Sequence, residues 1–334
     1  MKAAVVALLA SASLFAAVDG VVTNQTTGKP QAGVEVTLVK LGQGMDTVGT
    51  VKSDAQGKFR FDKDLDAAAP YMLQALYEGV SYNKVVPPGA PSSGLGLDIY
   101  SVSSKVADAT IAAHMILLQP TTEALGVNES IEYRNAGKVA FNDEKNGTLR
   151  FYLPPEAKGE VTVGITPPGG MPIQRPAEKT ATANVYMVNY PVKPGDTRFD
   201  IAYSLPPTKE FTGKAISGEK IRVVVPKGVK IQGEGLTSLG TEPSTQAEIF
   251  DTPAKTWKVS IEGTGTLRGS ADQQQNADAG GSEDTGPGIE EAKPRIYAKL
   301  PWMLGFAGVI FILGFAILYR ADPTVAATAS PKKK

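Results

Sequence analysis

Residues 33–38 read GVEVTL, and this short stretch decides the expected fold. Its apolar residues alternate with polar ones, which gives an extended strand one apolar and one polar face. The same alternation recurs in KFRF at 58–61 and in TWKVSI at 256–261. Further apolar runs of strand length lie at 149–153, 161–165, 185–190, 199–203 and 221–225. The pattern predicts an all-β protein whose sheets each bury one face.

Turn-forming residues separate these runs. Gln56-Gly57, Asn146-Gly147 and Lys227-Gly228 each place a glycine where a tight connection needs a positive φ. The chain contains 35 Gly and 24 Pro, which favours many short strands over long helices. We therefore predict two tandem β-sandwiches, over residues 18–118 and 119–264, with a possible division of the second near Phe211.

The first predicted domain resembles a known family. Residues 20–22 (GVV), 27–30 (TGKP), 33–38 (GVEVTL) and 53–61 (SDAQGKFRF) are similar, in this order, to the carboxypeptidase regulatory-like domains, and the resemblance spans residues 18–86. It implies a transthyretin-like β-sandwich with a non-catalytic, accessory role. The second domain is similar to a generic immunoglobulin-like sandwich.

Two apolar segments lie at the ends of the chain. Residues 1–17 have the charged start and apolar run of a secretory signal peptide. Residues 300–319 contain no charged residue and are long enough for one transmembrane helix. Residues 265–299 are polar and Gly-rich, as expected of a disordered stalk, and residues 320–334 would form a short cytoplasmic tail. The sequence thus predicts a single-pass cell-membrane protein with its sandwiches outside the cytoplasm, in the periplasm or extracellular space.

The composition excludes several kinds of chemistry. With no Cys and a single His, the chain cannot form disulfides, thiolate metal sites or a multi-histidine zinc site. Lys and Arg number 34 against 34 Asp and Glu, so the sequence shows no basic excess for nucleic acid. We expect no cofactor, no metal and no nucleic-acid partner.

One acidic motif and the single histidine are candidate metal ligands. Asp62, Asp64 and Asp66 form a D-x-D-x-D pattern, but Ala67 and Leu73 occupy the positions where a calcium loop needs Gly and Glu. We therefore interpret the three carboxylates as a charged strand end. His114 lies in an apolar run, and we expect a strand residue that is either satisfied in the core or turned outward.

One loop is a candidate contact site. Residues 166–172 read TPPGGMP, and a partner-binding loop is predicted at Pro168, Gly169, Gly170 and Met171 because they would expose an apolar side chain. The alternative interpretation is that Met171 packs back over the end of the sandwich.

These observations predict a non-catalytic binding or accessory component of the cell envelope, whose partner is another envelope protein or complex. The alternative is a glycan- or peptide-binding surface module. Exposed aromatic residues would favour glycan, whereas full burial of Tyr133, Tyr152 and Tyr186 would weigh against it. An unrecognised hydrolase would require two carboxylates converging within about 10 Å in a cleft.

Overall fold

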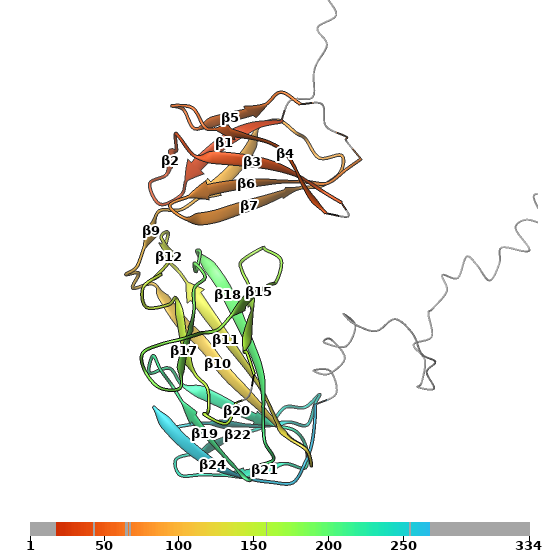
Figure 1. The fold of residues 1–334 in the computed structure, drawn as a ribbon, viewed down its shortest axis with the longest axis vertical. Helices are drawn as coiled ribbons and strands as arrows, with labels where there is room; N and C mark the ends of the chain where they lie inside the picture. Colours follow the sequence, from red (N-terminus) through yellow and green to blue (C-terminus); the bar gives the residue numbers. More distant parts are fainter. Residues whose placement is uncertain are drawn as a thin grey trace, which may run out of the picture. The chain divides into compact units, whose positions relative to one another are not determined.

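The structure is a computed structural model that describes residues 18–267, except 43, 64, 65, 67, 158 and 254. The predicted signal peptide, transmembrane helix and tail lie outside the described residues, as does the predicted stalk from residue 268 onward. Within residues 18–267, apart from those gaps, no helix has the length and apolar character needed to cross a membrane. The described chain is all-β, as the alternating runs predict (Figure 1).

Two four-stranded sheets form the first sandwich. β1 (Val18–Asn24) lies between β2 (Lys29–Pro30) and β5 (Lys58–Phe61) and also pairs in parallel with β8 (Leu95–Ile99). The second sheet has the order β4-β3-β6-β7, formed by β4 (Met45–Lys52), β3 (Glu35–Leu41), β6 (Tyr71–Tyr77) and β7 (Val80–Val86).

The core of this sandwich follows directly from the alternation. Val36 and Leu38 of β3 are fully buried, whereas Glu35 is exposed. They pack in one cluster with Phe59 of the facing sheet. The turn at Gly57 has φ of 72°, and a Cβ there would lie 2.7 Å from the Val22 carbonyl oxygen. Glycine is therefore required at this predicted turn.

The second sandwich contains a sheet of eight strands. Its order is β15 (Ile173–Pro176), β14 (Thr162–Thr166), β18 (Gly195–Leu205), β11 (Leu125–Asn135), β10 (Ala109–Pro120), β20 (Ile221–Val225), β23 (Glu248–Asp251) and β22 (Thr237–Thr241). β10 and β11 form a long antiparallel hairpin, and β10 pairs with β20 in parallel.

Two three-stranded sheets share a core with the inner face of the eight-stranded sheet. One has the order β13 (Leu149–Tyr152), β17 (Val185–Val188), β16 (Glu178–Lys179). The other has the order β19 (Glu210–Lys214), β24 (Thr256–Glu262), β21 (Lys230–Gln232). Two short strands, β9 (Val102–Ser103) and β12 (Ala140–Phe141), form a separate parallel pair.

The hydrophobic core of the second sandwich extends across two predicted boundaries, the one at residues 118/119 and the alternative one near Phe211. A single hydrophobic cluster extends from Ile116 to Ile261 and includes Phe211, so the core is continuous through the alternative division point near Phe211. The boundary expected at residues 118/119 falls inside β10. β10 belongs to the eight-stranded sheet because its inner face, with Ile116 and Leu118, packs in the second core.

Candidate functional site

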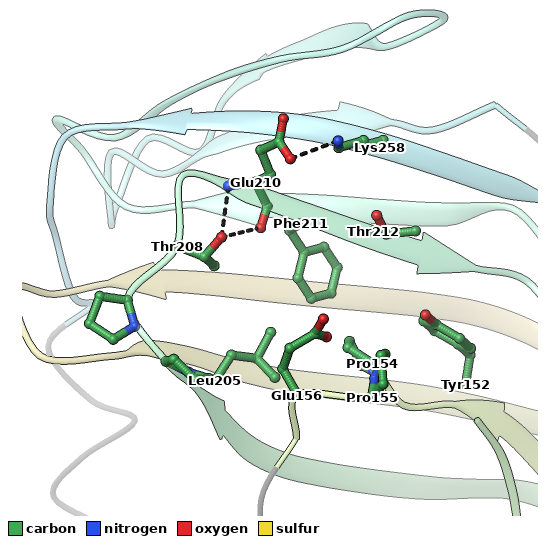
Figure 2. Close-up of a pocket in the computed structure, with 12 residues that line it drawn as sticks. Tyr152, Pro154, Pro155, Glu156, Leu205, Thr208, Glu210, Phe211, Thr212 and Lys258 are labelled. Carbon is green, nitrogen blue, oxygen red and sulfur yellow. Dashed lines mark hydrogen bonds and ion pairs between the residues drawn. The ribbon is translucent and has the colours of Figure 1, made fainter. Parts of the chain in front are cut away.

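A pocket of about 510 Å³ opens in the second sandwich, within the range typical of ligand sites (Figure 2). Its lining comes from the end of β13 and the chain after it, the end of β18 and the loop after it, β19, and one residue of β24. The lining residues are Tyr152, Pro154, Pro155, Glu156, Leu205, Pro206, Pro207, Thr208, Glu210, Phe211, Thr212 and Lys258.

The pocket lies between two strand edges. β13 is the terminal strand of its three-stranded sheet, and β19 is the terminal strand of the other. Tyr152 of β13 and residues 210–212 of β19 both line the pocket. Within the part of the chain that the structure describes, each of these strands is paired on one side only, so each carries a row of backbone groups on its free side.

The register of β19 shows which groups these are. The amide of Ile261 donates to the carbonyl of Lys209, and the amide of Ala215 donates to that of Lys255. In an antiparallel ladder every second residue bonds to the partner strand, so the alternate residues Glu210 and Thr212 direct their N–H and C=O groups away from β24.

A side chain satisfies one of these two residues. The Thr208 hydroxyl accepts from the Glu210 amide at 3.1 Å and donates to the Glu210 carbonyl at 3.0 Å (Figure 2). For Thr212, no hydrogen bond from its backbone amide is found among the described residues. The free edge of β19 is therefore capped at its start and open beside the pocket.

The same reasoning applies to β13. The amide of Leu153 donates to the carbonyl of Asn184 at 3.0 Å. Tyr152, the preceding residue, therefore directs its backbone groups away from β17. Both walls of the pocket thus present strand edges.

The walls are stiff. Four prolines, at 154, 155, 206 and 207, fix the backbone on two sides of the pocket. Phe211 is 2% exposed and lies against Trp257, with ring centroids 5.5 Å apart. The indole in turn covers Gly213, where a Cβ would lie 2.1 Å from Trp257 Cζ2. The cavity is preformed by packing.

The charges at the pocket are unevenly paired. Lys258 Nζ lies 2.7 Å from Glu210 Oε2, and Figure 2 shows the Glu210 carboxylate turned toward this ammonium group. Glu156 is exposed on the opposite wall and forms no salt bridge with any described residue. Glu156 and Glu210 thus line one pocket, and Glu210 is held in an ion pair that turns it toward Lys258.

The three tyrosines whose exposure would favour glycan binding are neither exposed as a pair nor fully buried. Tyr133, Tyr152 and Tyr186 are all half-buried. Tyr186 stacks on Phe151 at 6.3 Å, and Tyr133 stacks on Phe141 at 6.0 Å. Only Tyr152 of the three lines the pocket.

The predicted partner loop forms the turn of the β14–β15 hairpin and is not part of the pocket. Pro168 lies against Gly195, where a Cβ would be 3.0 Å from the proline ring. Gly169 has φ of 60°, and Gly170 donates to the Pro167 carbonyl at 3.2 Å. Met171 is 60% exposed, so the side chain faces solvent and does not pack back over the sandwich.

The structure also contains a buried ionic network that the sequence did not predict. His114 Nδ1 lies 3.2 Å from Glu219 Oε1, and Nε2 lies 3.2 Å from Glu129 Oε2. The Tyr203 hydroxyl donates to Glu129 Oε1 at 2.7 Å. The side chains of His114, Glu129 and Glu219 are all less than 10% exposed.

A signal for this network is present in β11. Leu125, Val127 and Ile131 alternate as core residues, and Glu129 occupies the core position between them. A carboxylate on the apolar face of a strand requires a partner, because burying it unpaired would be very costly. The lone histidine of the chain is that partner.

The network fixes the charge of the imidazole. Both ring nitrogens face carboxylate oxygens, which accept hydrogen bonds, so both nitrogens donate and the ring is protonated. Burial acts to lower the pKa of His114, but the hydrogen bonds and charges of Glu129 and Glu219 outweigh it and raise this pKa to about 9. For Tyr203, burial and the adjacent Glu129 raise the pKa of the hydroxyl well above its ordinary value.

Among the described residues, no group of three or more His, Asp or Glu side chains could hold a metal ion. Asp62 pairs with Arg60 at 2.6 Å, and Asp66 pairs with Lys40 at 3.4 Å. Asp64 lies outside the described residues.

Comparison with known proteins assigns no family. No protein-family model matches the chain, and no curated protein matches it. Among solved structures, an M1 zinc metallopeptidase from Deinococcus radiodurans aligns at 10% identity and a TM-score of 0.25, over 47% of this chain and 43% of that one. A mutant of this enzyme with a Tyr-Ser-Ala substrate aligns at 9% identity and a TM-score of 0.26, over 46% and 42% of the two chains. The chain thus spans less than half of these proteins, and matches this weak carry no argument about its activity.

Proposed function

We propose that this chain is a single-pass membrane protein whose exported β-sandwiches act as a non-catalytic binding component of the cell envelope. In this proposal another envelope protein occupies the pocket between β13 and β19. The observation that carries the proposal is the pocket itself, a preformed cavity of about 510 Å³ between two open strand edges. Export and anchoring rest on the apolar residues 1–17 and 300–319.

The finer fold assignments belong to the same proposal. The sequence of residues 18–86 supports a transthyretin-like sandwich of the carboxypeptidase regulatory-like type. An immunoglobulin-like sandwich is the corresponding proposal for residues 119–264. Both assignments fit a protein that acts by binding a partner.

Photo-crosslinking in intact cells tests the binding function. A benzoylphenylalanine replaces Glu156 at the pocket, and a matched variant carries it in place of Lys58, an exposed residue of β5. We expect an adduct with another envelope protein from position 156 and none from position 58. Adducts of the chain with itself alone would overturn the proposal.

Protease protection tests the location. Protease added to spheroplasts should degrade residues 18–264 while a cytoplasmic marker stays intact. If these residues were degraded only after lysis, the exported location would be wrong.

Glycan binding is a second candidate, favoured by one observation. The half-buried ring of Tyr152 lines the pocket, where a sugar could stack on it. Replacing Tyr152 with Leu would abolish binding of a sugar held by stacking. It would weaken a polypeptide held mainly by backbone hydrogen bonds much less.

A further inference from the structure

We propose that the pocket binds a short extended segment of the partner protein as an added β-strand along β19, with a lysine or arginine of that segment beside Glu156. This inference rests on the proposed function, because it names the chemistry of the partner in the same pocket. Three features of the pocket support it.

The first feature is the backbone. Thr212 of β19 and Tyr152 of β13 direct their N–H and C=O groups away from their own sheets, and both residues line the pocket. An extended polypeptide offers donors and acceptors at the strand repeat, which is how peptides add to an open sheet edge. Sugars do not have this regular spacing. The open part of β19 runs from Thr212 to Lys214, so about three residues of the segment, roughly 10 Å, would pair with it.

The second feature is the cap at the start of the edge. The Thr208 hydroxyl occupies both backbone groups of Glu210, so an added strand would begin its pairing at Thr212. The cap also prevents uncontrolled pairing along the whole strand, as edge strands commonly require. Thr212, the next residue with outward backbone groups, is open and also lines the pocket.

The third feature is charge. Lys258 neutralises Glu210 at 2.7 Å, whereas Glu156 has no ion-pair partner among the described residues. The pocket therefore carries a net charge of about −1, which favours a cation in the ligand. Side chains of a strand alternate between two faces, so apolar residues of the ligand would contact Phe211 and the prolines. The sequence that fits has alternate apolar residues with a basic residue between two of them.

A defined peptide tests this inference on the full-length protein in detergent micelles. The probe is the capped hexapeptide TVRVTV, added up to about 1 mM, a concentration that detects binding of roughly −4 kcal/mol. Hydrogen exchange followed by mass spectrometry reports on residues 208–214 and 149–155. We expect slower exchange of the Thr212 amide with TVRVTV. No slowing is expected with the same peptide N-methylated on the amides that would pair with β19.

Two variants of one residue separate backbone pairing from side-chain contact. Thr212→Pro removes the free amide, and proline is tolerated at an edge where that amide makes no ladder bond. Thr212→Val keeps the amide and removes the hydroxyl. We expect Thr212→Pro to weaken TVRVTV binding at least about tenfold and Thr212→Val to change it less than about twofold. A thermal unfolding midpoint near that of the wild type would show that each variant folds.

Glu156→Gln tests the charge. This change should weaken TVRVTV about threefold to fivefold and leave the uncharged peptide TVQVTV unaffected, because a partly exposed ion pair contributes up to about 1 kcal/mol.

Several results would overturn strand addition. They are absence of protection with TVRVTV, equal protection by the N-methylated peptide, or protection by cellotetraose in place of peptide. If Thr212→Pro folds poorly, the N-methylated peptide on the wild-type protein still decides the question. Failure of these tests is distinguishable from failure of the proposed function, since the adduct expected from position 156 would persist if a partner binds in another way.

Discussion

His114 Nδ1 lies 3.2 Å from Glu219 Oε1, and this contact joins β10 to the connection between β19 and β20. β19 and β20 belong to different sheets of the second sandwich, and β10 lies in the sheet of β20. The ion pair therefore holds the connection between the two sheets against β10. Within this connection, the Ser217 amide donates to Glu219 Oε2 at 2.9 Å, which orients the carboxylate. The buried ionic network of His114, Glu129 and Glu219 thus holds the two sheets together. Because its members are titratable, it predicts that the free energy of unfolding depends on pH.

Folding raises the pKa of His114 from 6.5 to about 9, so folding favours the protonated imidazole. The contribution to stability is complete below about pH 6.5 and is lost as the pH rises to 9, with a size of roughly 3 kcal/mol. Urea unfolding of the wild type and of His114→Gln at pH 6 and pH 9.5 measures it. The difference between the two proteins should shrink at the higher pH, and a difference independent of pH would contradict the prediction.

Glu219 titrates in the opposite sense. Burial opposes ionisation, but the hydrogen bond from His114 and the backbone amides lower the pKa of this carboxyl below 4.5. Its contribution is therefore present above about pH 4.5 and is lost as the pH falls below that value. Glu219→Gln should be less stable than the wild type at pH 6, and the gap should narrow at pH 3. Equal gaps at both values would show that the carboxylate plays no ionic part.

The hydrogen bond from Tyr203 to Glu129 is 2.7 Å long and buried. Tyr203→Phe removes this donor and leaves a carboxylate oxygen less satisfied, so we expect a loss of about 1–3 kcal/mol in the free energy of unfolding. Tyr82→Phe provides a control in the other sandwich, where the lost bond, to the Tyr100 carbonyl at 2.9 Å, involves no charge. Tyr82→Phe should lower the free energy of unfolding less than Tyr203→Phe does. The reverse order would contradict the role given to Glu129.

Gly213 leaves room for the Trp257 indole, on which the pocket residue Phe211 packs. A methyl group at this position would lie 2.1 Å from Trp257 Cζ2, so Gly213→Ala should displace the indole and cost about 1–3 kcal/mol. Gly96→Ala in β8 is a matched strand control, because no atom lies within 4 Å of its would-be Cβ. Thermal unfolding should show a lower midpoint for the first variant only. Since Phe211 packs on Trp257, peptide binding at the pocket should also weaken.

Replacing the exposed Met171, unlike the buried residues above, should leave stability unchanged. Met171→Ser should leave the thermal midpoint within about 1 °C, because a solvent-facing side chain contributes little to folding. If the hairpin turn contacts a partner, a photo-crosslinker at this position will form an adduct in cells. Without an adduct, the partner-binding role of residues 168–171 would be abandoned.

The strands could be predicted from sequence because burial on one face imposes a period of two on each of them. Val36 and Leu38, Phe59 and Phe61, and Val259 and Ile261 all lie in cores for this reason. The positive φ angles at Gly57, Gly147 and Gly228 are likewise local requirements of their turns. Fold class, turn positions and the solvent exposure of much of each strand follow from neighbours along the chain.

Pairing between distant residues depends on tertiary structure. β10 joins β20, over 100 residues later, and only that sheet brings His114 to Glu219. The pocket is equally non-local, because it exists where the unpaired edges of β13 and β19 meet the end of β18. Alternation tells which way a side chain faces, but not which strand lies beside it. The sequence by itself therefore determined which face of each strand is buried, because that is a local pattern, and the tertiary structure decided the network and the pocket, because both depend on which strands become neighbours.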